Sequence, residues 1–262
     1  MTGFLVSELR RALVSPWFAA GFLVCFLGLV FSGNSELDFQ APQGDAFTAF
    51  HYAYRDNNSF WFFVVGCALP YAGSYCEDRR WGLFPLERGR ISLPWFVTAR
   101  VVACGISGGL ALCTALALFW ILCVLGTETN IPAEPGWAAS FEEVLPYMAL
   151  VSQENMAAYL GLFLGAQFFH GAFWACLALA VSAFASRSYE VYAAPLIVAM
   201  ILVQLGDMVG LPDMLNPCRL STDVVLSGPL VTELAIDGLY GVGIAVADWV
   251  FYGGLKRRWR RG

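Results

Sequence analysis

The sequence predicts an all-α membrane protein with six transmembrane helices, and three observations support this prediction. Hydrophobic residues make up 58% of the 262 residues and charged residues only 13%, roughly half the charged fraction of a soluble domain. Six apolar runs are long enough to form spans, although the first two fall short of the ~20 residues that a helix needs to cross a bilayer and are expected to extend into their flanks. The basic residues gather in alternate connections between these runs. We therefore treat residues 1–262 as a single transmembrane domain.

An amphipathic helix is predicted at the start of the chain, over residues 2–15. Leu5, Leu9 and Leu13 fall on one helical face, with Glu8 and Arg11 opposite them. A helix of this kind lies along the membrane surface rather than crossing it. The predicted spans that follow are 17–32, 60–75, 101–125, 157–185, 191–209 and 236–255.

The connections between the spans differ in character. The outer loop 33–59 ends in an aromatic group, His51, Tyr52 and Tyr54, which fits either an interfacial belt or a substrate gate. A capping box over residues 140–143 predicts a short helix on the outer surface within 126–156. The proline-containing segment 211–237 is expected to dip back into the outer leaflet. The inner connection 76–100 is basic and is the longest on its side.

The distribution of charge predicts the orientation of the chain. With the N-terminus inside, all 15 Lys and Arg residues except Arg55 and Arg219 fall on the inner side. Basic connections are retained in the cytoplasm during insertion, so both termini are predicted to be cytoplasmic and the chain to lie in the cell membrane. An odd number of spans would place the basic C-terminal tail outside.

Several classes of protein are excluded by absent motifs. The eight cysteines form no C-x-x-C pair, and the two histidines form no metal-binding motif, so we expect no metal site. Lys256, the one lysine, lies between Leu255 and Arg257 and so belongs to no phosphate-binding P-loop. The chain is therefore not expected to hydrolyse ATP or to bind a cofactor itself. No basic patch with interleaved aromatic residues predicts nucleic-acid binding.

Polar residues inside the predicted spans are candidates for a translocation pathway, because they are costly in the bilayer and tend to face a cavity or a partner. Internal hydrogen bonding and contact with the interface at helix ends explain them equally well. The candidates lie on one face of the fourth span and on one stripe of the fifth: Gln167, His170, Met200, Gln204 and Asp207. Asp248 in the sixth span has the same two interpretations.

A serine and a histidine offer an alternative function. Ser107 lies in the sequence Gly105-Ile-Ser-Gly108, which resembles the nucleophile motif of rhomboid-type intramembrane serine proteases, and His170 is predicted at a similar depth. An intramembrane hydrolase using these two residues is one interpretation. In the other, Ser107 belongs to a stripe of small residues, with Gly105 and Gly109, that packs helices together.

The inner connection 76–100 carries a more extensive resemblance. An acidic pair, Glu77 and Asp78, is followed by Gly82, an apolar piece with proline, two arginines and a restarting helix. With the N-terminal surface helix and the order of six spans, this pattern resembles the type-2 permease family of ATP-binding-cassette (ABC) transporters. The pattern departs from that family in having Leu83 after Gly82, where a threonine is usual, and in its early proline.

The resemblance implies a permease subunit of an ATP-driven exporter, which pairs with a second permease subunit as a homo- or heterodimer. A separate ABC ATPase subunit would bind ATP and Mg²⁺ and dock on connection 76–100. The residues that the resemblance assigns to this coupling are Glu77, Asp78, Trp81, Gly82, Leu83, Phe84, Arg88, Arg90 and Arg100. A stand-alone channel or membrane sensor is the remaining alternative.

Overall fold

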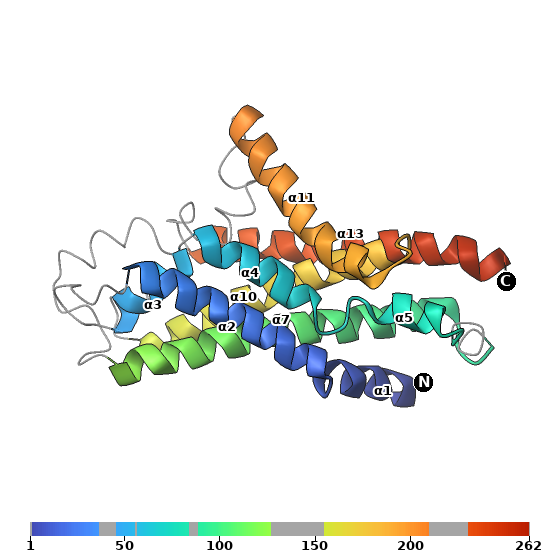
Figure 1. Ribbon diagram of the computed structural model, residues 1–262, viewed down its shortest axis with the longest axis horizontal. Helices are drawn as coiled ribbons and strands as arrows, with labels where there is room; N and C mark the ends of the chain where they lie inside the picture. The colour runs from blue at the N-terminus through green and yellow to red at the C-terminus, as the bar shows by residue number, and fades with distance from the viewer. Residues whose placement is uncertain are drawn as a thin grey trace.

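The computed structural model describes residues 2–36, 46–55, 57–83, 89–126, 155–209 and 230–261, and these residues form helices and turns with no strand among them. Figure 1 shows the helices arranged as an elongated bundle. Their bounds are α1 (Thr2–Leu13), α2 (Pro16–Glu36), α3 (Ala46–Arg55), α4 (Asn57–Ala68), α5 (Ser74–Arg80), α7 (Leu93–Gly126), α10 (Met156–Ser182), α11 (Ser188–Val209) and α13 (Leu230–Arg261).

Five of these helices, α2, α7, α10, α11 and α13, are long and apolar enough to cross a membrane. The chain therefore has the helices of a multi-pass α-helical membrane protein. The span predicted over 60–75 is not one continuous helix: the structure divides it into α4, a turn over residues 69–73 and the start of α5. Helix α4 ends at Ala68 after 12 residues, which is about 18 Å against a hydrocarbon core of about 30 Å.

The break after α4 has a local cause in Pro70. A proline lacks the N–H that would continue the helix, and its ring clashes with the carbonyl four residues earlier, here that of Gly66. The same carbonyl faces α2 so closely that a Cβ on Gly21 would lie 2.5 Å from it. The chain then turns through residues 69–73 before α5 begins.

Helices α7 and α10 make the most extensive contact of the described fold. Their backbones approach closely at Gly108, which has no side chain: a Cβ added there would lie only 3.0 Å from the Gly171 carbonyl oxygen. Gly109, from the predicted small-residue stripe, also packs against α10 at Phe168. Gly161 and Gly165, a second pair with the same spacing, lie in open space: a Cβ added at either would meet no other described atom within 4 Å.

One end of the bundle is closed by α3, which lies in the predicted outer loop 33–59. Its Phe47, Phe50, His51 and Tyr54 side chains are buried, and His51 Nε2 lies 2.8 Å from the hydroxyl of Tyr159 in α10. His51 and Tyr54 are therefore core residues rather than a lipid-facing belt. The sequence pattern had placed the aromatic group correctly at the end of the loop but not inside the bundle.

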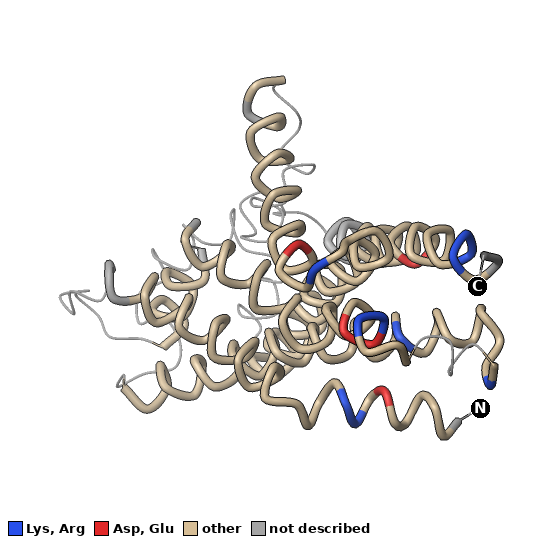
Figure 2. Tube along the Cα trace, turned by 45° about the vertical axis from the view of Figure 1, so that its right-hand side comes forward, with Lys and Arg blue, Asp and Glu red and all other residues tan. Residues whose placement is uncertain are grey.

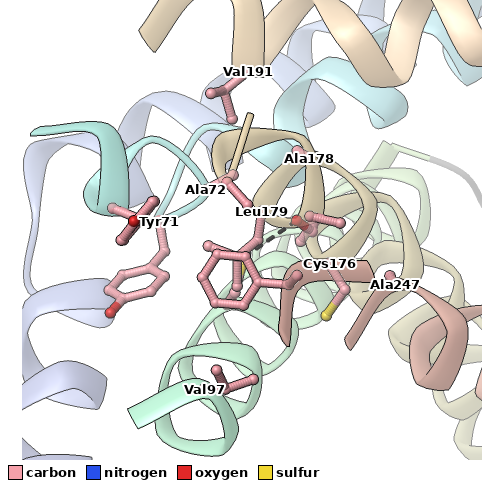
Figure 3. Close-up of a cluster of buried hydrophobic side chains, with 14 of the residues drawn as sticks. Tyr71, Ala72, Val97, Cys176, Ala178, Leu179, Val191 and Ala247 are labelled. Carbon is pink, nitrogen blue, oxygen red and sulfur yellow. Dashed lines mark hydrogen bonds between the residues drawn. The ribbon is translucent and has the colours of Figure 1, made fainter. Parts of the chain in front are cut away.

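The opposite end of the bundle holds the N-terminus, the C-terminus and the connection between α5 and α7 (Figure 1). In Figure 2 the described charged residues gather in the same half of the molecule. A second hydrophobic cluster supports this end. Figure 3 shows part of this cluster, to which the turn before α5 contributes Tyr71 and Ala72, α7 contributes Val97, α10 contributes Leu179 and α13 contributes Ala247.

Most of the other predicted boundaries shift by three or four residues at most, and the largest changes lie in connection 76–100 and in α13. Connection 76–100 is partly helical, because α5 extends to Arg80 and α7 begins at Leu93, eight residues before the predicted span. Helix α13 extends beyond the predicted span 236–255 at both ends. The predicted surface helix near residues 140–143 and most of the segment 211–237 lie outside the described residues. Helix α11 diverges from the bundle (Figure 1).

Candidate functional site: the α1–α5–α7 network

A buried carboxylate joins three helices at the end of the bundle that holds both termini. Asp78 of α5 is 1% exposed. The Nη1 atom of Arg11, in the last turn of α1, lies 2.8 Å from the Asp78 carboxylate. The guanidinium of Arg100, in α7, donates a hydrogen bond to the same carboxylate. We call Glu8, Arg11, Tyr71, Asp78 and Arg100 the α1–α5–α7 network.

Arg100 is the most deeply buried cation of the network. Its side chain has no exposed surface. It occupies the buried stripe of α7 one turn after Phe96, and its Cζ lies 4.6 Å from the centroid of the Phe96 ring. The Tyr75 ring is 5.9 Å away. A carboxylate and two aromatic faces thus replace the water that a buried guanidinium loses.

A second contact fastens α1 to the turn before α5. The Tyr71 hydroxyl donates a hydrogen bond to the Glu8 carboxylate, and both side chains are buried. Phe4 of α1 also stacks on Phe96 of α7, with 6.0 Å between the ring centroids. Helix α1 therefore contacts α7 through Phe4 near its start and α5 through Arg11 in its last turn.

Helix α5 is also fastened to the C-terminal end of α10. Arg79 donates a hydrogen bond to the Ala185 carbonyl oxygen. The Cys76 sulfur lies 3.5 Å from the Ser182 carbonyl oxygen. Ser182 is the last residue of α10, whose final carbonyl groups lack intrahelical partners, and Ala185 lies three residues beyond it. The seven residues of α5 thus link α1, α7 and α10.

The electrostatics of the network favour the charged form of Asp78. Burial alone would raise the pKa of this carboxyl. The hydrogen bond from Arg11 and the positive charge of Arg100 outweigh that effect, so the pKa of Asp78 lies below its usual value. Arg11 remains partly exposed, and a second carboxylate, Glu77, lies 3.9 Å from its Nη2 atom. Asp78 is therefore an anion in the folded protein at neutral pH.

Immediately after the network, the end of α5 presents an apolar tip to solvent. The N–H of Leu83 donates to the Asp78 carbonyl at 2.9 Å, and the N–H of Gly82 donates to the Arg79 carbonyl at 3.2 Å. This is the Schellman pattern of helix termination, and Gly82 has the φ of +70° that it requires. The turn leaves Trp81 77% exposed and Leu83 43% exposed.

The structure divides the predicted coupling residues into two groups. Trp81, Gly82, Leu83 and Arg90 are exposed, whereas Glu77 is partly buried. Asp78 and Arg100 are buried, so they hold the exposed tip in place and offer no contact surface of their own. Phe84 and Arg88 lie outside the described residues.

The predicted pathway residues are not brought together. Gln167 and His170 are buried in α10, whereas Met200 and Gln204 are exposed on α11. Among the described residues, no hydrogen bond or ring contact joins the two groups. Asp207 lies in α11, and its side chain is outside what the structure describes.

The geometry of His170 does not favour a serine–histidine pair. Its Nδ1 atom donates to Gln167 Oε1 at 3.1 Å, and its Nε2 atom accepts from the Trp174 indole at 2.7 Å. The Ser107 hydroxyl donates to the carbonyl of Cys104 in its own helix at 3.0 Å. Both ring nitrogens of His170 are thus occupied, and neither can accept the proton of Ser107. The packing interpretation of Ser107 fits the structure better.

Three members of the network were not among the predicted site residues. Arg11 and Glu8 were assigned to the outward face of the surface helix, but Glu8 is only 5% exposed. Tyr71 was placed inside a span. The signal available in the sequence was the opposite charge of Arg11 and the Glu77–Asp78 pair, which the surface helix brings to the same end as the inner connection.

Compared with family models, curated proteins and solved structures, the chain shows no match.

Proposed function

We propose that this chain is the permease subunit of an ATP-driven ABC exporter. The exposed tip formed by Trp81 and Leu83 is the docking surface for a separate ATPase subunit, which binds ATP and Mg²⁺. The observation that carries this proposal is the attachment of the tip: an exposed apolar turn directly follows a short helix that is fastened to three other helices. A second permease subunit, identical or not, completes the transporter.

The attachment gives the tip a mechanical role. A displacement of Trp81 moves α5, because the Schellman turn ties Leu83 to Asp78. Asp78 transmits that movement to α1 and α7 through Arg11 and Arg100. The Arg79 hydrogen bond to Ala185 transmits it to α10. A stand-alone channel or sensor has no need for an exposed apolar turn attached in this way.

The sidedness of the proposal follows the charge. The N-terminus, the C-terminus and the α5–α7 connection lie at one end (Figure 1), and the basic residues of the tail lie there too. We place this end in the cytoplasm by the positive-inside rule. ATP is available there, so the proposed docking surface and the proposed energy source lie on the same side of the membrane.

Copurification tests the proposal. The tagged full-length chain, expressed in its own cells and extracted in mild detergent, is expected to retain an ATPase that contains a P-loop. Trp81→Glu is expected to reduce that retention at least tenfold, because a carboxylate replaces the largest apolar side chain of the tip. Leu125→Glu is the matched control: Leu125 is also 77% exposed, but it lies at the far end of α7. Equal loss in both variants, or retention of the ATPase by Trp81→Glu, would refute the docking surface.

A further inference from the structure

A groove between α10 and α13 is a second candidate site, separate from the α1–α5–α7 network. It has a volume of about 290 Å³. Its walls are apolar: Phe173, Leu177 and Phe184 come from α10 and its C-terminal turn, and Gly243, Val246 and Val250 come from α13. Both helices are long and apolar enough to cross the membrane. A groove of this composition on membrane-crossing helices is suited to a hydrocarbon chain.

The shape of the groove depends on a glycine. A Cβ on Gly243 would lie 2.6 Å from the Phe173 ring. Any larger residue would therefore push the ring away and change the groove wall. Near the other end of the groove, Gly254 allows the Phe184 ring to approach α13, where a Cβ would meet Cζ of that ring at 2.9 Å. The ends of the two walls are thus packed against each other.

Each wall ends in an exposed arginine. Arg257 follows Gly243 and Val250 at steps of seven residues, so it lies on the same face of α13, about two turns beyond Val250. Arg187 follows Phe184 by three residues, just after the end of α10. Because Phe184 contacts α13 at Gly254, three residues before Arg257, both cations lie at the same end of the groove.

Neither arginine is neutralised by a carboxylate in the described part of the chain. The Arg187 guanidinium contacts the hydroxyl of Tyr189 at 3.3 Å. The neighbouring Glu190 carboxylate accepts from the backbone N–H groups of Ser186 and Arg187. The ion pairs of the described residues involve only Arg11 and Arg100. Two exposed cations with no ion pair in the described part of the chain thus lie at one end of an apolar groove.

We infer that this groove binds an anionic phospholipid, with an acyl chain between α10 and α13 and the phosphate group held by Arg187 and Arg257. The two arginines select the headgroup. A headgroup that carries a phosphate and no positive group of its own is attracted to two guanidinium groups more strongly than a zwitterionic headgroup is. The lipid comes from the leaflet that faces the end of the bundle with both termini. Its binding joins α10 to α13 and does not depend on the proposed ATPase docking.

Native mass spectrometry of the full-length chain in an uncharged detergent tests this inference. The chain is titrated with phosphatidylglycerol and, separately, with phosphatidylcholine carrying the same acyl chains. Arg187→Gln and Arg257→Gln are each expected to weaken phosphatidylglycerol binding about fivefold. Lys256→Gln is the matched control, because Lys256 is about 120° around the helix from Val250 and lies against the Tyr252 ring. It is expected to change binding less than twofold.

A second pair of variants tests the groove with both arginines intact. Val250→Trp fills the groove and is expected to reduce phosphatidylglycerol binding at least fivefold, whereas Ala245→Trp, on an exposed face of the same helix, is expected to leave it unchanged. Equal binding of the two lipids would overturn the inference. So would an effect of Lys256→Gln as large as that of Arg257→Gln, or unchanged binding by Val250→Trp.

Discussion

Replacing Asp78 by asparagine tests how strongly the α1–α5–α7 network holds α5. The substitution keeps the size of the side chain and removes its charge. Arg100, which has no exposed surface, then loses the carboxylate it contacts. Breaking a buried ion pair by removing one partner costs about 3–5 kcal/mol, because a charge stays buried without its counter-charge. The contribution of the more exposed Arg11 is about 0.2–1 kcal/mol.

The expected cost is large enough to measure as a thermal shift. For a chain of this size, 1 kcal/mol corresponds to about 2–4 °C in the unfolding midpoint, so Asp78→Asn is expected to lower the midpoint by about 6–20 °C. Arg11→Gln is expected to lower it by about 4 °C at most. The assay is tryptophan fluorescence of the purified full-length chain during heating in detergent.

A double substitution separates the charge from the packing. In an Arg100→Met background the buried Arg100 guanidinium is gone. Asp78→Leu is therefore expected to lower the free energy of unfolding by at least about 2 kcal/mol less in this background than in the native chain. A shift below about 2 °C for Asp78→Asn, which corresponds to about 1 kcal/mol or less, would refute the reasoning. So would an effect of Arg11→Gln as large as that of Asp78→Asn.

Three further predictions concern pH, sidedness and the serine. The pKa of Asp78 is lowered by folding, so its stabilising contribution is fully present above the unfolded value of about 3.9 and is lost as the pH falls through the folded value; the midpoint difference between the native chain and Asp78→Asn should be constant from about pH 7 to 5 and shrink below about pH 4. Leu83→Cys in a Cys218→Ser background should react with an impermeant maleimide only after cells are opened, whereas Cys218 in the native chain should react in intact cells. The native chain and Ser107→Ala should show the same background labelling by a fluorophosphonate probe, and labelling that depends on Ser107 would support the hydrolase alternative.

The helical class and the clustering of charge at one end could be predicted from the sequence. Long apolar runs are a direct signal for membrane-crossing helices, and α7, α10 and α13 contain the predicted spans almost completely. The termination of α5 was also readable, because Gly82 is the residue type that the Schellman turn requires. The break at Pro70 was visible in principle. The residues on both sides of Pro70 are apolar, so hydropathy alone predicts a continuous span. Hydropathy carries no information about the backbone N–H that proline lacks.

The tertiary contacts of the site could not be read from the sequence. Glu8 and Arg100 are charged residues of types that usually face solvent, and only the residues that they contact in the folded chain explain why they are buried. Asp78 pairs with Arg11, which is 67 residues away in the sequence, and with Arg100, which is 22 residues away. The burial of His51 has the same origin, because its partner Tyr159 lies 108 residues further along the chain. Periodicity describes one helix at a time and gives no information about such partners.

A photo-crosslinker at position 81 in living cells tests the proposed function most directly. We expect Trp81→benzoylphenylalanine, introduced into the full-length chain, to crosslink on illumination to a protein whose sequence contains a P-loop. The same substitution at Leu125, equally exposed at the far end of α7, should not capture that protein. Capture of the ATPase from position 125 but not from position 81, or crosslinking of position 81 only to lipid, would contradict the account.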